Sequence, residues 1–264
     1  MASQKTTMNR DELLSILKKL GIRTLIDGLD DFLSRAQTEK WRAHTIIEQL
    51  AVEELREREQ RSLQCRLRDS KIGNFVPMAN FDWRWPKTID RKTIDRLLTA
   101  DFADRAENVI FVASHGLGKT MIAKNLIHRA ILKGHTALFV ETAQMVNDLS
   151  SQDSARALER RLKYYAKPSV LCIDEVGYLP SDQRAADLLF QIVSRRYEKK
   201  SIIVTTNLAF SDWNTVFPGA TSVVSLIDRL IHHSEITSIK GDSYRRKQAE
   251  EQKAARATNR RSQK

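Results

Sequence analysis

The sequence has few of the features that mark secreted or membrane proteins. Among its 264 residues there are only two cysteines, Cys65 and Cys172, which cannot build a disulfide framework and which favour a reducing, cytoplasmic setting. No apolar run approaches the roughly 18 residues that a membrane-spanning helix needs. No short apolar segment follows a basic start, as it does in a secretory signal. We therefore expect a cytoplasmic protein without membrane association.

Acidic residues are in deficit. Lysine and arginine number 44 against 33 aspartate and glutamate residues, which gives a net charge of +11. Residues 240–264 hold nine basic and three acidic side chains, more than half of the excess. A basic balance of this size favours a polyanionic partner. The basic tail at residues 247–264 is typical of a solvated chain end and equally of an arm that binds nucleic acid.

Helical periodicity predicts a small all-helical N-terminal domain over residues 1–70. Leucines recur at helical spacing between residues 13 and 20, and Gly21 suits a helix end. From residue 44 to 67, arginine and glutamate alternate, which favours a salt-bridged exposed helix over a nucleic-acid-binding stripe. These helices carry no catalytic signature, so we expect them to dock a partner. Residues 71–107 begin with prolines and aromatics and are predicted as a linker that packs onto the next domain.

Residues 108–246 alternate short apolar, β-branched runs with helical segments. The runs suit strands that are buried on both faces of a parallel sheet, and they lie at residues 109–112, 137–140, 170–173 and 202–205. Helical patterns lie between them, at residues 119–133, 142–149, 153–166 and 183–199. This alternation predicts an α/β domain in which helices flank a parallel sheet.

A glycine-rich loop follows the first predicted strand and precedes a helical segment. A phosphate-binding loop has Gly, four residues, Gly, Lys and then Ser or Thr in this context, and here Ala113 replaces the first glycine. Lys119 would contact the β- and γ-phosphates of ATP, and Thr120 would hold Mg²⁺. The alternative is a chance glycine-lysine turn, which the strand-loop-helix context disfavours. The predicted ATP-binding residues are Ala113, Ser114, His115, Gly116, Leu117, Gly118, Lys119, Thr120 and Met121.

Polar side chains end two further predicted strands. The apolar run at residues 169–173 leads into Asp174 and Glu175, and unpaired carboxylates at a buried strand end are costly. Beside a phosphate loop, Asp174 would coordinate Mg²⁺ and Glu175 would orient and deprotonate the attacking water. The alternative is a solvated strand end. Asn207 follows the strand at residues 202–206 and can reach between the γ-phosphate and that water.

With these elements in order, the chain resembles the AAA+ ATPases and, within them, the branch of DnaC-type and IstB-like proteins. The IstB-like members are helper ATPases of bacterial insertion-sequence transposition. The resemblance runs from about residue 10 to residue 246 and leaves out only the basic tail. It implies an AAA+ P-loop NTPase fold behind a small helical domain. The segments that carry it are residues 116–120, 173–180, 206–213, 226–233 and 240–245.

The resemblance also implies roles for single residues. Asn207 matches the first sensor residue, and Arg229 matches the arginine finger that completes the ATP site of a neighbouring subunit, which makes the protein a homo-oligomer. The alternative for Arg229 is an ordinary surface arginine. Arg245 is either a second phosphate sensor or a DNA contact. His232 and His233 are adjacent, so we expect them on different faces of a helix, as poor joint metal ligands.

Basic residues on one predicted helix are the candidates for DNA contacts. Arg156, Arg160 and Lys163 are spaced by four and three residues, which places them on one helical face, and Arg161 lies alongside. In initiator-type AAA+ proteins this part of the fold faces the nucleic acid. We expect salt-sensitive contacts with the backbone of double-stranded DNA. The alternative is a solvated face.

Together these observations predict a DNA-binding, self-assembling ATPase that uses ATP and Mg²⁺ and helps a transposase to select target DNA. The close alternative is a DnaC-like loader of a replicative helicase, which would use the same ATPase with another partner. A small-molecule kinase and a non-hydrolysing DNA scaffold are more distant alternatives.

Overall fold

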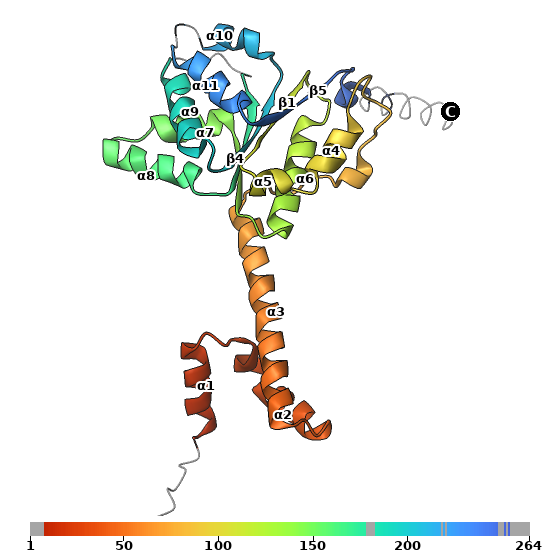
Figure 1. Cartoon of the computed structure of the whole chain (residues 1–264), viewed down its shortest axis with the longest axis vertical. Coiled ribbons are helices and arrows are strands. Elements are labelled where there is room, and N and C mark those ends of the chain that lie inside the picture. Colours follow the sequence, from red (N-terminus) through yellow and green to blue (C-terminus); the bar gives the residue numbers. More distant parts are fainter. Residues whose placement is uncertain are drawn as a thin grey trace, which may run out of the picture. The chain divides into compact units, whose positions relative to one another are not determined.

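A computed structural model describes residues 8–177, 183–217, 219, 221–247, 251 and 253. The chain divides into two compact units, Met1–Cys65 and Arg66–Lys264. Figure 1 shows the first unit as helices and the second as a sheet with helices around it.

The first unit is helical. Its helices are α1 (Arg10–Lys19), α2 (Thr24–Thr38) and most of α3 (Ala43–Asp69), which continues into the second unit. Helix α1 begins at a capping box between Asn9 and Glu12, and Gly21 follows its end with a φ of +73°. The buried core of this first unit is formed by Leu17, Leu29 and Phe32.

The long helix α3 carries the ion pairs expected from its sequence. Arg58 pairs with Glu54 at 2.6 Å, and Arg61 pairs with Glu54 and with Glu57. The two pairs that are four residues apart, Glu54 with Arg58 and Glu57 with Arg61, are of the kind that stabilises an isolated helix by about 0.2–0.5 kcal/mol each. The expected ion pairs are present, but Glu54 is buried and also accepts a hydrogen bond from the Thr24 hydroxyl at 2.7 Å, so the charges of α3 also serve its packing against α2.

The second unit is built on a parallel sheet of five strands. Their order is β2-β3-β4-β1-β5 and every pairing is parallel. The strands are β1 (Asn108–Ala113), β2 (Ala137–Glu141), β3 (Val170–Val176), β4 (Ser201–Thr206) and β5 (Ser234–Ile239). The first four confirm the predicted apolar runs. Strand β5 was not predicted, because it lies at the sheet edge and alternates polar with apolar side chains instead of forming an apolar run.

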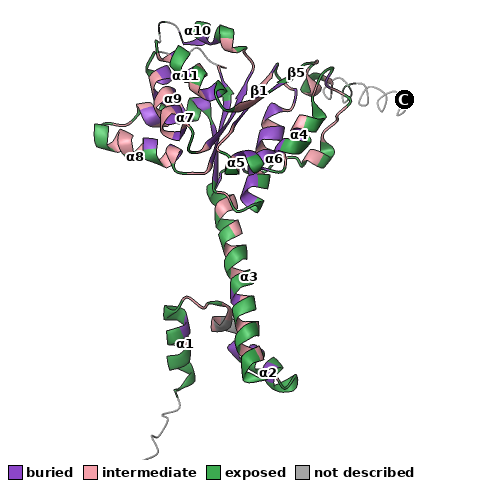
Figure 2. Cartoon of the chain, viewed as in Figure 1, coloured by how far each residue is buried: buried purple, intermediate pink, exposed green. Residues whose placement is uncertain are grey.

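Helices cover both faces of this sheet, and the central strands β3, β4 and β1 are largely buried between them (Figures 1 and 2). On one side lie α7 (Thr142–Ser150), α8 (Ala155–Ala166), α9 (Gln183–Arg196) and α11 (Ser222–Ile231). On the other side lie α4 (Arg91–Leu97), α5 (Asp101–Asp104) and α6 (Lys119–Leu132). Short helices complete the unit: η1 (Met78–Asn80), η2 (Phe210–Asp212) and α10 (Trp213–Val216). The predicted α/β fold and its four helical segments are thus confirmed.

Apolar side chains from strands and helices meet in one core. Ile110, Leu171 and Val204 of the central strands pack with Ile192 of α9 and Leu226 of α11, all at most 2% exposed. Because the strands are parallel, their carboxyl ends meet at one edge, where loops can bring polar groups together. Within the described part of the chain, no helix has the length and apolar character needed to cross a membrane.

Candidate functional site

The glycine-rich loop joins β1 to α6 at this carboxyl edge. Gly116 and Gly118 have φ angles of +76° and +86°, which L side chains rarely adopt. A Cβ atom on Gly116 would lie 2.2 Å from the Oγ of Ser243, and one on Gly118 would lie 2.7 Å from the ring of Phe81. Both conformation and space therefore require glycine. The loop ends at the N-terminus of α6, where backbone N–H groups and the helix dipole attract anions.

Ala113 is compatible with this loop. It is the last residue of β1, it is 5% exposed, and it is not among the residues with positive φ. An alanine therefore fits without strain where the loop motif has glycine. Its carbonyl oxygen accepts a hydrogen bond from Lys119 Nζ at 2.6 Å, and the carbonyl of Ser114 accepts another at 2.9 Å. Burial lowers the pKa of Lys119, an effect that the carboxylates of Asp174 and Glu175 oppose.

Asp174 lies beside the start of α6. It is 3% exposed, and Thr120 Oγ1 donates to its two carboxylate oxygens at 3.1 and 3.0 Å. The hydroxyl of Thr205 on β4 donates to the same carboxylate, and the hydroxyl of Thr142 donates to the Asp174 carbonyl at 2.8 Å. A hydroxyl and a carboxylate in contact are hard oxygen donors, the kind that hold Mg²⁺ together with nucleotide phosphates. Thr120 and Asp174 therefore fit the predicted metal position.

Glu175 occupies an unusual backbone conformation. Its φ is +59°, and the register between β3 and β4 shifts between Ile173 and Val176. The backbone N–H of Glu175 donates to Thr205 Oγ1 at 2.9 Å, while its side chain is exposed. Positive φ in a residue other than glycine costs about 1–3 kcal/mol and often marks a functional position. Here the irregularity turns Glu175 out of the strand, so that its side chain lines a cavity with Asn207.

That cavity has a volume of about 450 Å³, within the usual range for a ligand site. The glycine-rich loop, Glu175 and Asn207 form one part of its lining, and Asn207 Nδ2 lies 3.4 Å from His115 Nε2. The predicted residues Lys119, Thr120 and Met121 also line it. The predicted ATP-binding residues from His115 to Met121 and the two residues predicted to serve the attacking water therefore line the same cavity, whereas Ala113 and Ser114 are not part of its lining.

Part of the cavity wall was missed by the sequence interpretation. Its further lining residues come from two segments of the sequence. Val76, Phe81 and Trp85 precede β1, and Tyr244 follows β5. Trp85 Nε1 donates to the carbonyl of Asp242 at 2.7 Å, and the Trp85 and Tyr244 rings are 6.0 Å apart. The only signal was the group of aromatics after residue 71, which indicated packing. Nothing in their spacing indicated that they wall a ligand site.

Arg245 also lines this cavity. The preceding residue, Tyr244, donates its backbone N–H to the carbonyl of Gly116 at 2.9 Å, which ties the segment to the glycine-rich loop. The charge of Arg245 contributes to lowering the pKa of Lys119, after burial as the main cause. The structure thus places Arg245 beside the phosphate loop.

Arg229 lies elsewhere. It belongs to the last turn of α11, where its guanidinium donates to the hydroxyl of Ser194 and lies over the rings of Phe190 at 4.7 Å and Tyr197 at 5.8 Å. Among the described residues, the cavity lining includes Arg245 but not Arg229. Within its own chain, Arg229 is therefore separate from the candidate ATP site.

Helix α8 shows two kinds of basic side chain. Arg156 and Arg160 are exposed and have no ion-pair partner among the residues that the structure describes, and Lys163 is exposed with Glu159 at 3.6 Å. Arg161 instead pairs with Asp148.

The surroundings of Arg161 explain this difference. Its guanidinium lies 4.5 Å over the ring of Tyr164, and the hydroxyl of Tyr165 donates to Asp148 at 2.6 Å. The hydrogen bond to Asp148 raises the pKa of Arg161. Arg161 is thus part of the packing between α7 and α8, unlike its three basic neighbours on α8.

Two sequence expectations fall outside the described residues. They concern residues 178–180 of the motif that follows β3, and residues 248–250, 252 and 254–264 of the basic tail.

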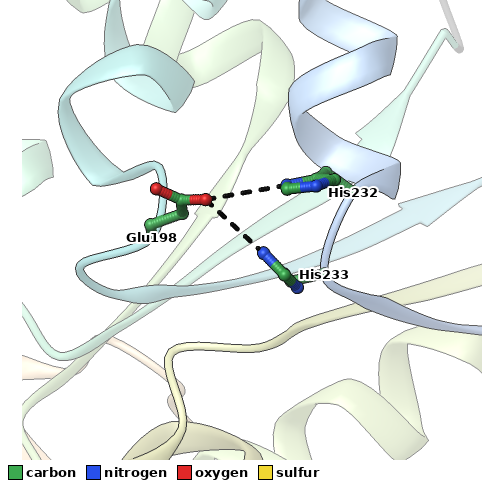
Figure 3. Close-up of side chains that lie close together, drawn as sticks. All are labelled: Glu198, His232 and His233. Atoms are coloured by element: carbon green, nitrogen blue, oxygen red, sulfur yellow. Dashed lines mark ion pairs between the residues drawn. The ribbon is translucent and has the colours of Figure 1, made fainter.

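The expectation that His232 and His233 point to different faces of a helix is wrong. Helix α11 ends at Ile231, so His233 lies between the helix and β5 instead of within a helical turn. The two rings have centroids 4.0 Å apart, and both face Glu198 (Figure 3).

The fold and this arrangement of glycine-rich loop, acidic strand end and polar residue on the next strand define an ATP-binding protein of the AAA+ type. Residues 15–252 match the family of IstB-like ATP binding proteins, and the chain belongs to this family.

Relatives and a solved structure agree with this assignment. The chain is 38% identical to an ATP-binding protein named for insertion sequence IS5376 of Geobacillus stearothermophilus, over 76% of this chain and 81% of the relative. It is 34% identical to the corresponding IS21 protein of Pseudomonas aeruginosa, over 90% and 89%. The crystal structure of DnaI superposes with a TM-score of 0.53 at 16% identity, over 62% of this chain and 91% of that one, which shows a shared fold.

Proposed function

We propose that this protein is an oligomerising, DNA-binding ATPase that assists a transposase in selecting target DNA for an insertion sequence. Its relatives are named for ATP binding in insertion sequences. The observation that carries the proposal is that the residues predicted to act on ATP within one chain lie apart from the predicted arginine finger. Lys119, Thr120 and Glu175 line one cavity, and Thr120 is hydrogen-bonded to Asp174, whereas Arg229 is absent from the cavity lining within the described residues.

In the proposed reaction, the loop and Lys119 bind the phosphates of ATP. The ammonium of Lys119 exchanges the carbonyls of Ala113 and Ser114 for β- and γ-phosphate oxygens, which compensate its burial better than neutral acceptors do. Thr120 and Asp174 would hold Mg²⁺, which would neutralise charge on the phosphates.

Glu175 and Asn207 serve the attacking water. The backbone irregularity at Glu175 turns its carboxylate into the cavity, where it orients the water and accepts its proton. Asn207, anchored beside His115, contacts the γ-phosphate side of that water. Arg245 of the same chain adds positive charge near the phosphates, which favours its role as a phosphate sensor over that of a DNA contact.

Arg229 completes the site of a neighbouring subunit. A cation delivered in trans to the γ-phosphate accelerates hydrolysis by roughly 10³–10⁵-fold in well-studied NTPases. Ser194 and the aromatic rings hold the guanidinium at the end of α11, so it is positioned before a second subunit arrives. ATP would then act at the interface between subunits, and its hydrolysis would release them.

The exposed basic side chains of α8 are the proposed DNA contacts. Arg156 and Arg160 are available to bind phosphates, with Lys163 on the same helix. Binding of this kind neutralises the DNA backbone and does not read base edges.

The test is the ATPase rate per subunit, measured over a range of protein concentrations with and without double-stranded DNA. We expect the specific rate to rise with protein concentration and with DNA, and Arg229→Ala to remove this rise while ATP binding is retained. Arg105→Ala, which changes an exposed arginine paired with Glu107, is the control. A rate that is independent of concentration and of DNA would contradict the proposal.

The partner is tested separately. Co-purification from cells that express the transposase of the same insertion sequence supports the proposed role. Co-purification with a replicative helicase instead would identify a helicase loader with the same ATPase.

A further inference from the structure

Glu198, His232 and His233 form a cluster (Figure 3), and none of the three lines the ATP cavity. Glu198 Oε1 lies 3.7 Å from His232 Nδ1 and 3.5 Å from His233 Nε2. One potential ligand atom from each residue lies within 4.8 Å of the other two. All three side chains are about half exposed, so an ion in solution can reach them.

The backbone brings these residues together from two elements. Glu198 follows the end of α9 with a φ of +57°, a conformation usually given to glycine after a helix. His232 caps the C-terminus of α11, and the carbonyl of His233 accepts the N–H of Asn108 at 2.7 Å, which holds the start of β5 against β1. The three donors are therefore fixed by the fold and not by a flexible loop alone.

The surroundings of the cluster contain several charges. The carboxylate of Asp228 acts electrostatically on Tyr197, which neighbours Glu198, and Glu107 interacts with His233. Arg105 pairs with Glu107, and Arg229 lies over the Tyr197 ring. Arg96 also acts electrostatically on Glu107, so the surrounding charges are mixed, and the Glu198 carboxylate is the anion that faces both imidazoles.

We propose that Glu198, His232 and His233 bind one transition-metal ion, of which Zn²⁺ fits best. Two imidazoles and one carboxylate are a donor set that suits Zn²⁺, whereas Mg²⁺ and Ca²⁺ prefer oxygen alone. Bonds of about 2.0–2.2 Å in a tetrahedron put ligand atoms about 3.4 Å apart. The two carboxylate-imidazole separations are already close to that value, and the ligand atoms of the two imidazoles lie within 4.8 Å of each other.

Tyr197 lies beside the cluster and forms a hydrogen bond that metal binding would replace. The hydroxyl of Tyr197 lies 2.7 Å from His232 Nδ1, the nitrogen that faces Glu198. The metal replaces that hydrogen bond and does not need the hydroxyl. Three protein ligands leave the fourth position to water or to a group from another molecule, as in open zinc sites.

A metal here links the end of α9 to the junction between α11 and β5. Arg229 lies three residues before His232 on α11. If the proposed function holds, the ion steadies the helix end that carries the arginine finger. This consequence rests on the proposed function, but metal binding itself does not.

The test is to titrate the full chain, without an affinity tag, with Zn²⁺ in a calorimeter. A second titration uses Co²⁺ and is followed by visible absorption. We expect one ion per chain. Glu198→Gln and His233→Gln should each weaken binding by at least the roughly 10–100-fold that loss of an outer-shell partner costs. Tyr197→Phe should bind at least as tightly as the unaltered chain, because it removes the hydrogen bond that the metal must replace. His135→Gln is the matched control, because His135 faces Asp104 at 3.1 Å without a second imidazole among the described residues.

Absence of binding, or equal affinity in the unaltered chain, Glu198→Gln and His233→Gln, would overturn the proposal. Two substitutions keep the result clear if one of them disturbs folding. Lys119→Ala separates this test from that of the proposed function, because it should abolish ATP hydrolysis while Zn²⁺ affinity is unchanged.

Discussion

Two cations of this chain, Lys119 and Arg229, are held in contrasting ways. Lys119 is buried beneath the glycine-rich loop and lines the cavity. Arg229 is held by the Ser194 hydroxyl and by aromatic rings, outside the described lining of that cavity. The contrast teaches that a single chain can assemble a nucleotide pocket, while under the proposed function the last catalytic charge comes from a second copy. Binding and hydrolysis should therefore respond to different substitutions.

The largest effect is expected for Lys119→Ala. It removes the cation that the loop aims at the phosphates, so both ATP binding and turnover should be lost. Equilibrium binding of a fluorescent ATP analogue and the steady-state ATPase rate measure the two losses. Lys124→Ala is the control on the same helix, since Lys124 lies over the Phe139 ring at 4.6 Å. Equal loss in both variants would show that α6 is merely destabilised.

Glu175→Gln should separate binding from hydrolysis. A general base contributes roughly 10²–10⁴-fold to a rate, so turnover should fall by about that factor while ATP still binds. The same two measurements apply, with unaltered protein as reference. Turnover within a factor of about two of the reference would remove Glu175 from its proposed role.

The basic residues of α8 allow a second comparison. Arg156→Ala and Arg160→Ala should each weaken DNA binding and lower the slope of log affinity against log salt by about one. Arg161→Ala should instead lower thermal stability, because it removes the guanidinium that pairs with the Asp148 carboxylate. Fluorescence anisotropy with duplex DNA over a salt series, together with thermal melts, distinguishes these outcomes. A salt slope unchanged in Arg156→Ala and Arg160→Ala would mean that this face is merely solvated.

The smallest effect is expected for Ala113→Gly, which restores the usual loop residue. Because the backbone of Ala113 does not have positive φ, ATP affinity should barely change. The free energy of unfolding should fall by about 0.5–1 kcal/mol, the usual cost of glycine in a strand. ATP binding tenfold tighter than in the unaltered chain would instead show that alanine distorts the loop.

The sequence predicted those parts of the fold and site that depend on local pattern. Four strands are apolar runs, and the loop and Asp174 stand at strand ends, where residue type alone indicates chemistry. Strand β5 was missed because its polar residues lie at a sheet edge. Three features were not predictable, because each depends on packing between different segments of the chain. They are the lining of the cavity by Trp85, the pairing of Arg161 with Asp148, and the approach of His233 to Glu198.

The measurement that tests the central claim most directly is a mixing experiment. Glu175→Gln and Arg229→Ala proteins, each impaired alone, are combined at equal concentration with ATP and duplex DNA. An Arg229→Ala subunit keeps a complete pocket, and a Glu175→Gln neighbour supplies the missing arginine, so the mixture should regain ATPase activity. A mixture no more active than its separate components would contradict an arginine that acts between subunits.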